Sequence, residues 1–151
     1  MFFHRLEPAR CLGQNGRISA ENTGLDPQFH LDLGKALRPL RDDGILILGS
    51  GMSYHNLPKM MSSVRGAPSD ADPDSVRFDD WIADTLTTGD ARTREVALIN
   101  WQQAPGARGA HPREEHLIPL HVVVGAGGAE SGQRMLRDTV LGGAVSAFQF
   151  A

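Results

Sequence analysis

Two histidine-bearing segments hold the residues whose types and spacing could do chemistry. The first is residues 49–57 (GSGMSYHNL), in which His55 follows a glycine-flanked turn. The second is residues 111–116 (HPREEH), which combines two imidazoles with two adjacent carboxylates. Imidazole and carboxylate groups act as metal ligands and as general acids or bases near neutral pH. The first hypothesis is therefore a metal or acid–base site built from these two segments.

The second segment is superficially similar to the zinc-binding helix of metalloproteases, whose histidines lie four positions apart. His111 and His116 lie five positions apart, a rotation of about 500° on a helix, which places them about 140° from each other. Pro112 also keeps His111 in the preceding loop. His116 with Glu115 or Glu114 could still face a site, although a single histidine is more often packed or solvent-facing. A zinc hydrolase using His55, Glu115 and His116 stays open as one hypothesis.

The elements that must position these residues alternate between helix and strand. Asp26-Pro27 is a typical helix start, and the apolar spacing predicts a helix that ends at Asp43-Gly44. The continuous apolar run Ile45–Leu48 predicts a strand covered on both faces, which places His55 at a strand exit. Further expectations are a helix-compatible stretch through Met61, a loop over 62–74, helices over 75–88 and 91–100, a loop over 101–112, a helical turn over 114–120, and strands over 122–124 and 144–150. Helices and buried strands together predict an α/β fold.

Composition limits the possible function classes. The chain has 151 residues, which fits one domain, and a net charge of −3 with scattered Lys and Arg, which argues against a nucleic-acid partner. Cys11 is the only cysteine, so neither an intrachain disulfide nor a cysteine-based zinc site is expected. No apolar run is long enough to cross a bilayer, so no membrane is expected, and a cytoplasmic address is the simplest expectation. Neither glycine-rich turn has the residues of a phosphate-binding loop.

A resemblance becomes specific when the longer motifs are read in order. Residues 46–57 (LILGSGMSYHNL), 78–81 (FDDW), 104–108 (APGAR) and 110–122 (AHPREEHLIPLHV) resemble the catalytic chains of the class III extradiol ring-cleavage dioxygenases. Within that superfamily the sequence is most similar to the 4,5-DOPA dioxygenase type. The similarity runs from about Gly24 to Phe150. It implies a three-layer αβα sandwich with a mixed central sheet, truncated relative to the family.

The resemblance also implies an activity and roles for individual residues. The family opens catechol-type aromatic rings with O2 and a non-haem divalent metal, usually Fe(II), with Zn(II) as the other ion to consider. His55 matches the family's catalytic acid–base histidine close to the metal, and His116 matches a histidine at the metal site. Glu115 would be a ligand or would orient one. His111 and Arg108 are candidates for contacting the substrate, Arg108 through a substrate carboxylate.

The chain departs from the family in its length. Family chains are about twice as long, and their N-terminal half supplies two further metal-binding histidines. Residues 1–23 form an irregular segment unlike the family, and residues 24–151 match its C-terminal part. Two hypotheses follow: an extradiol dioxygenase, or its C-terminal part, completed by a homo-oligomer or by a separate N-terminal half; or a catalytically inactive remnant or binding subunit that retains the fold.

Overall fold

A computed structural model describes residues 2–4, 24–64, 66 and 70–151 of the chain. In the described part, the elements follow one another in the order β1 (Phe2–His4), α1 (Pro27–Leu37), the 3₁₀ helix η2 (Arg38–Arg41), α2 (Leu57–Val64), α3 (Pro73–Thr88), α4 (Ala91–Ile99), the 3₁₀ helix η3 (Trp101–Gln103), α5 (Ala107–Ala110), α6 (Ile118–Gly127), β2 (Gln133–Val140) and β3 (Gly143–Phe150).

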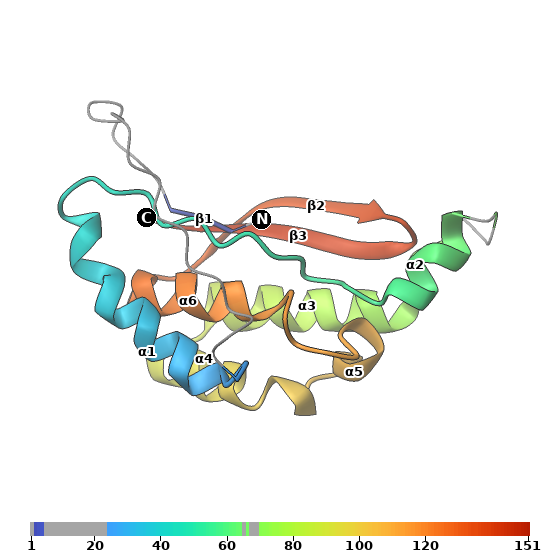
Figure 1. The fold of residues 1–151 in the computed structure, drawn as a ribbon, viewed down its shortest axis with the longest axis horizontal. Helices are drawn as coiled ribbons and strands as arrows, with labels where there is room; N and C mark the ends of the chain where they lie inside the picture. The colour runs from blue at the N-terminus through green and yellow to red at the C-terminus, as the bar shows by residue number, and fades with distance from the viewer. Residues whose placement is uncertain (1, 5–23, 65, 67–69) are drawn as a thin grey trace.

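The three described strands form one mixed sheet in the order β1-β3-β2. β1 is parallel to β3, and β2 is antiparallel to β3. The β2–β3 hairpin turns at Leu141 and Gly142, both of which have positive φ angles, of 50° and 75°. The helices α1, α3, α4 and α6 lie on the same side of the sheet (Figure 1). The expected α/β character and mixed sheet are confirmed. The described residues form two layers, the sheet and the helices on one side of it, where three layers were expected.

The predicted starts of α1 and α4 are confirmed by their capping contacts. The side chain of Asp26 accepts a hydrogen bond from the Phe29 backbone N–H at 2.9 Å, and Asp90 accepts one from the Thr93 N–H at 2.8 Å. These contacts satisfy backbone donors that a helix leaves free at its first turn. The first helix is α-helical only to Leu37 and continues as the 3₁₀ turn η2, which contains Pro39.

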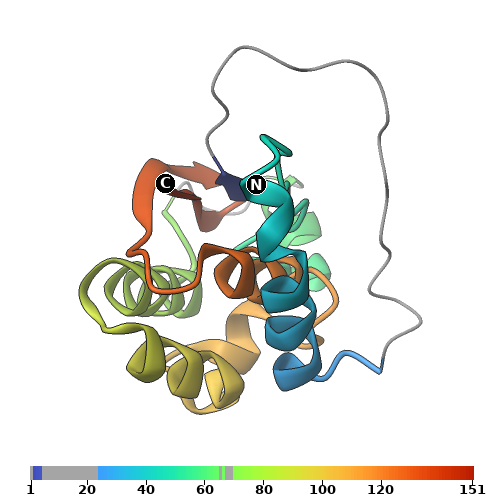
Figure 2. The same cartoon turned by 90° about the vertical axis from the view of Figure 1, so that its left-hand side faces the viewer.

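The strand expected at residues 122–124 is wrong, because this apolar run lies inside α6. Eight of the ten residues of α6 are buried. Figure 2 shows α6 at the centre of the helices, with α1 on one side and α3 on the other. A short apolar run fits a buried strand or a buried helix equally well, so the elements that pack against it determine which of the two it forms. Here the partner is α1: a Cβ on Gly34 would overlap the Val122 carbonyl oxygen, and one on Gly125 would overlap the Leu31 carbonyl oxygen.

The strand expected at Ile45–Leu48 is also wrong. These residues have no regular strand assignment, and Ile45, Leu46 and Leu48 are 46%, 36% and 46% exposed. None of the described strands pairs along this segment, and a strand needs a neighbouring ladder for its backbone groups. Conversely, the sequence did not predict β2. All of its residues are exposed, so it has no buried face and no alternating apolar pattern.

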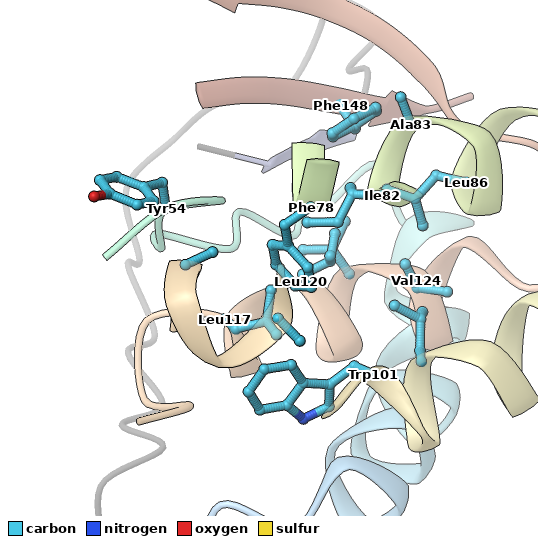
Figure 3. Close-up of a cluster of buried hydrophobic side chains, with 14 of the residues drawn as sticks. Tyr54, Phe78, Ile82, Ala83, Leu86, Trp101, Leu117, Leu120, Val124 and Phe148 are labelled. Atoms are coloured by element: carbon cyan, nitrogen blue, oxygen red, sulfur yellow. The ribbon is translucent and has the colours of Figure 1, made fainter. Parts of the chain in front are cut away.

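The core lies between the sheet and the helices beneath it. Phe148 of β3 packs in a cluster with Phe78, Ile82 and Leu86 of α3, and the cluster extends to Trp101 (Figure 3). Of the irregular segment expected over 1–23, residues 2–4 form β1, and the others lie outside the described residues. Within the described part of the chain, no helix combines the length and apolar character needed to span a bilayer.

Candidate metal and acid–base site

His55 lies in the extended segment that precedes α2. Its backbone N–H donates to the carbonyl oxygen of Ala110 at 3.0 Å. The next residue, Asn56, begins α2: its carbonyl oxygen accepts from the Met60 N–H at 2.9 Å, and its Oδ1 accepts from the Lys59 N–H at 3.3 Å. An asparagine at this position is a favoured helix cap. The backbone on both sides of His55 is therefore held in place.

His116 lies in the turn that leads into α6. The Glu114 carbonyl oxygen accepts hydrogen bonds from the N–H groups of Leu117 and Ile118, at 2.8 and 3.0 Å. This turn brings the imidazole ring of His116 against that of His55, with ring centroids 3.6 Å apart and planes inclined by 34°. The structure therefore joins the two segments that the sequence singled out.

Glu115 completes a cluster with the two histidines. One potential ligand atom from each of His55, Glu115 and His116 lies within 4.8 Å of the other two, and all three side chains are half-buried. Oε2 of Glu115 is buried without a hydrogen-bond partner among the described residues, and it lies 3.4 Å from Nε of Arg113. Two imidazoles and one carboxylate are the donor set of non-haem Fe(II) sites and of many zinc sites. The residues present fit a divalent metal.

Burial and charge both affect the state of His55. Burial lowers the pKa of His55 below its usual value of 6.5, and the neighbouring His116 lowers it further, against an opposing effect of Glu115. The imidazole is therefore neutral at pH 7. A neutral imidazole has a free lone pair that can bind a metal or accept a proton.

His111 and Arg108, the expected substrate contacts, make contacts inside the protein. The His111 side chain is fully buried, and its Nε2–H donates to the Ser53 carbonyl oxygen at 3.0 Å. The Arg108 guanidinium lies 4.7 Å from the centre of the Trp101 ring, and its Nη1 contacts Oε2 of Glu114 at 3.0 Å. His121 is also fully buried and donates from Nε2 to the Leu98 carbonyl oxygen at 3.1 Å, which gives it a packing role away from the cluster.

Two residues that help to build the site were not singled out from the sequence. Gly51 allows its segment to approach the turn of His116, because a Cβ there would overlap the His116 carbonyl oxygen. Asn56 joins α2 to α5, since its Nδ2 donates to the Gly109 carbonyl oxygen at 2.8 Å. The sequence could have indicated Asn56 as a helix cap, because it stands directly before Leu57-Pro58, a typical helix start. Nothing local in the sequence marks the close approach at Gly51.

An apolar groove lies between the segment before His55 and the β2–β3 hairpin. Its volume is about 350 Å³, and its walls include Met52 on one side and Met135, Leu136 and Val145 of the hairpin on the other. None of His55, Glu115 and His116 lines it. The groove is therefore not formed by the side chains of the candidate site.

The sequence of this chain matches a known protein family. Residues 17–149 match the family described as the catalytic LigB subunit of aromatic ring-opening dioxygenase. The chain belongs to this family. Both histidine-bearing segments fall within the matched residues, so the cluster of His55, Glu115 and His116 is built entirely from the family domain.

The chain is also similar in sequence to individual proteins, over less than half of their length. The chain is 36% identical to the 4,5-DOPA dioxygenase extradiol of Beta vulgaris over 128 residues, which are 81% of this chain and 43% of that protein. It is 36% identical to dioxygenase tasH of Hapsidospora irregularis over 124 residues, 78% of this chain and 38% of that protein. The chain spans about two-fifths of the length of these relatives.

A solved structure supports the fold. The crystal structure of an uncharacterized protein from Escherichia coli K12 matches 80% of this chain and 48% of its own chain, with a TM-score of 0.65 and 27% sequence identity. The described elements therefore adopt part of the fold of a longer protein. That structure and the longer relatives agree that the match ends well short of their full length.

Proposed function

We propose that this chain carries the acid–base residue and part of the metal site of an extradiol ring-cleavage dioxygenase that opens catechol-type aromatic rings with O2. The observation that carries the proposal is the convergence of His55, Glu115 and His116, whose ligand atoms lie within 4.8 Å of one another. Fe(II) is the proposed ion, with Zn(II) as the alternative, since imidazole and carboxylate groups bind both.

The proposed roles follow from the state of each side chain. His55 is neutral because its pKa is lowered, so it can take a proton from a phenolic hydroxyl of the substrate and return it during ring opening. His116 and Glu115 would hold the metal through an imidazole nitrogen and a carboxylate oxygen. A bound divalent iron would supply coordination positions for the substrate oxygens and for O2.

Arg108 is the proposed contact for an anionic substituent of the substrate. Its side chain is 45% exposed and is paired with Glu114, so a substrate carboxylate would compete with an internal carboxylate for the same guanidinium. The Arg108 guanidinium also lies 4.7 Å from the centre of the Trp101 ring, whose centre is 6.1 Å from that of the His111 ring. A catechol with a carboxylate and one without should therefore differ in their dependence on Arg108.

We further propose that another polypeptide completes the site and the third layer of the fold. The chain spans about two-fifths of the relatives named above, and in the described part of the chain the apolar side chains of Ile45, Leu46 and Leu48 are exposed. Exposed apolar patches of this kind are typical of association surfaces. The completing chain would be a second copy or a separate N-terminal half. The alternative is a binding subunit or inactive remnant that keeps the fold without turnover.

An anaerobic titration of the purified chain with Fe(II) tests the metal site. Calorimetry should show stoichiometric binding that is lost in His116→Ala and weakened in Glu115→Gln. Glu114→Gln is the matched control, because Glu114 is adjacent but bonds to Arg108, and it should bind the metal as the wild type does. Absence of binding in the folded wild type, at every assembly state seen by size-exclusion chromatography, would contradict an independent metal site.

An oxygen electrode then separates the three functions. O2 consumption that depends on a catechol and on His55 supports the dioxygenase. Metal binding without turnover, alone and after addition of a candidate N-terminal half, supports the binding subunit. Hydrolysis of a substrate without O2 consumption would instead support a zinc hydrolase.

A further inference from the structure

The segment that presents His55 is held by the end of α5 and by His111, the residue that follows it. The Gly109 carbonyl oxygen accepts from Asn56 Nδ2 at 2.8 Å, the Ala110 carbonyl oxygen accepts from the His55 N–H at 3.0 Å, and His111 Nε2–H donates to the Ser53 carbonyl oxygen at 3.0 Å. Two of these three hydrogen bonds are made by side chains. Their geometry therefore depends on the residues at positions 56 and 111.

His111 is well suited to a fixed, directional contact. Its ring is fully buried and packs edge-on against Phe78 and Trp101, with centroid distances of 5.3 and 6.1 Å. Burial lowers the pKa of His111 to about 4, so the ring is neutral at pH 7 and carries one proton. Because a carbonyl oxygen can only accept, that proton lies on Nε2 and points at Ser53.

The other end of the same segment is tied to His116 itself. The Met52 N–H donates to the His116 carbonyl oxygen at 2.9 Å, and only a glycine at position 51 permits this approach. The segment is thus attached to the turn of His116 at Met52, to His111 at Ser53, and to α5 at His55 and Asn56. These hydrogen bonds join the two segments that carry the imidazole rings.

We propose that His111 and Asn56 are positioning residues that hold the His55 ring against His116 through their hydrogen bonds to Ser53 and Gly109. The inference rests on the proposed function for the importance of this ring pair, and on the described hydrogen bonds for the geometry. Neither residue needs to touch substrate or metal in this role. Both act through the backbone that carries His55.

Substitutions can separate this role from simple packing. His111→Gln keeps a donor near the position of Nε2, whereas His111→Met fills a similar volume and removes it. Asn56→Asp keeps an oxygen that caps α2 through the Lys59 N–H and removes the donor to Gly109. His121→Met is the matched control, because His121 is another fully buried histidine that donates from Nε2 to a carbonyl oxygen, on Leu98, outside the cluster.

The first readout is the nuclear Overhauser effect between the ring protons of His55 and His116 in the metal-free chain. The second is the affinity for Zn(II), measured by calorimetry. We expect His111→Met and Asn56→Asp to lose the inter-ring effect and to bind Zn(II) about 10–100-fold more weakly, as is typical when residues that orient metal ligands are removed. His111→Gln should retain most of both, and His121→Met should lower thermal stability without changing either.

The outcomes distinguish the positioning role from the proposed function. An unchanged inter-ring effect and Zn(II) affinity in His111→Met and Asn56→Asp would overturn the positioning role and leave the metal site standing. Equal losses in His121→Met would also overturn it, because the effect would then follow global stability. If the wild type binds no Zn(II) but the variants still lose the inter-ring effect, positioning holds and the metal site fails. Should His111→Met not fold, Asn56→Asp carries the same test.

Discussion

The imidazole ring of His55 lies 3.6 Å, centre to centre, from that of His116, although α2, α3, α4 and α5 separate the two residues along the chain. Two positive charges at this distance would repel strongly in a partly buried site. The pair therefore favours the neutral form of His55, the form that can bind a metal or accept a proton. Several measurable properties depend on this pair and on the packing that supports it.

Removal of the neighbouring ring should raise the pKa of His55. Burial is the larger cause of its lowered pKa and His116 is the second, so His116→Ala should move the pKa only part of the way back toward 6.5. A titration of the histidine ring signals by NMR in the metal-free chain measures this shift. An unchanged or lower pKa in His116→Ala would show that the rings do not interact in solution. His121→Met, outside the cluster, should leave the His55 pKa unchanged.

The buried His121 should make the fold sensitive to acid. Its pKa is lowered from 6.5 to about 4, chiefly by burial, so above pH 6.5 the folded and unfolded states both hold it neutral. Between pH 6.5 and about 4 only the unfolded state binds the proton, so stability falls as the pH falls. The full loss corresponds to about 3 kcal/mol. Urea unfolding across this pH range should show a shallower decline in His121→Met than in the wild type, and identical declines would contradict the assignment.

The arginines of β2 should stabilise the fold by pairing with the buried carboxylate of Asp79. It is fully buried, and its Oδ2 lies 3.3 Å from Nε of Arg137 and 3.7 Å from Nη1 of Arg134. Removing one arginine leaves a buried charge poorly compensated, so Arg137→Met should lower the free energy of unfolding by about 1–3 kcal/mol. In an Asp79→Asn background the same substitution should cost much less. Additive costs in this double-mutant cycle, measured by denaturant unfolding, would rule out the coupling.

A methyl side chain at position 34, where α1 crosses α6, should destabilise the fold. Alanine is a better helix former than glycine by about 1 kcal/mol, so propensity alone predicts that Gly34→Ala stabilises α1. Its Cβ would overlap the Val122 carbonyl oxygen, so we expect a net destabilisation of about 1–3 kcal/mol instead. Thermal unfolding measures the sign. Ala36→Gly, at an exposed position of the same helix, is the control and should cost only the propensity difference.

Local signals in the sequence were sufficient for the starts of α1 and α4 and for the chemistry-bearing segments, whereas α5 lies where a loop was expected. Asp26 and Asp90 begin helices because their side chains can accept from the first-turn N–H groups, a contact made within four residues. The motifs around His55 and His116 likewise marked the family, and the match over residues 17–149 confirms that membership. These features depend on neighbours along the chain, so the sequence alone contained them.

The tertiary structure decided what depends on distant partners. The run at 122–124 became a helix because Gly34 and Gly125 let α1 and α6 approach closely, and Ile45–Leu48 formed no strand because none of the described strands pairs along it. The contact between the rings of His55 and His116 accompanies hydrogen bonds from the segment before α2 to the end of α5 and to the turn of His116. Such bonds join residues far apart in sequence, where no periodicity records them. The sequence therefore indicated which residues could do chemistry, and only the tertiary contacts brought those residues together.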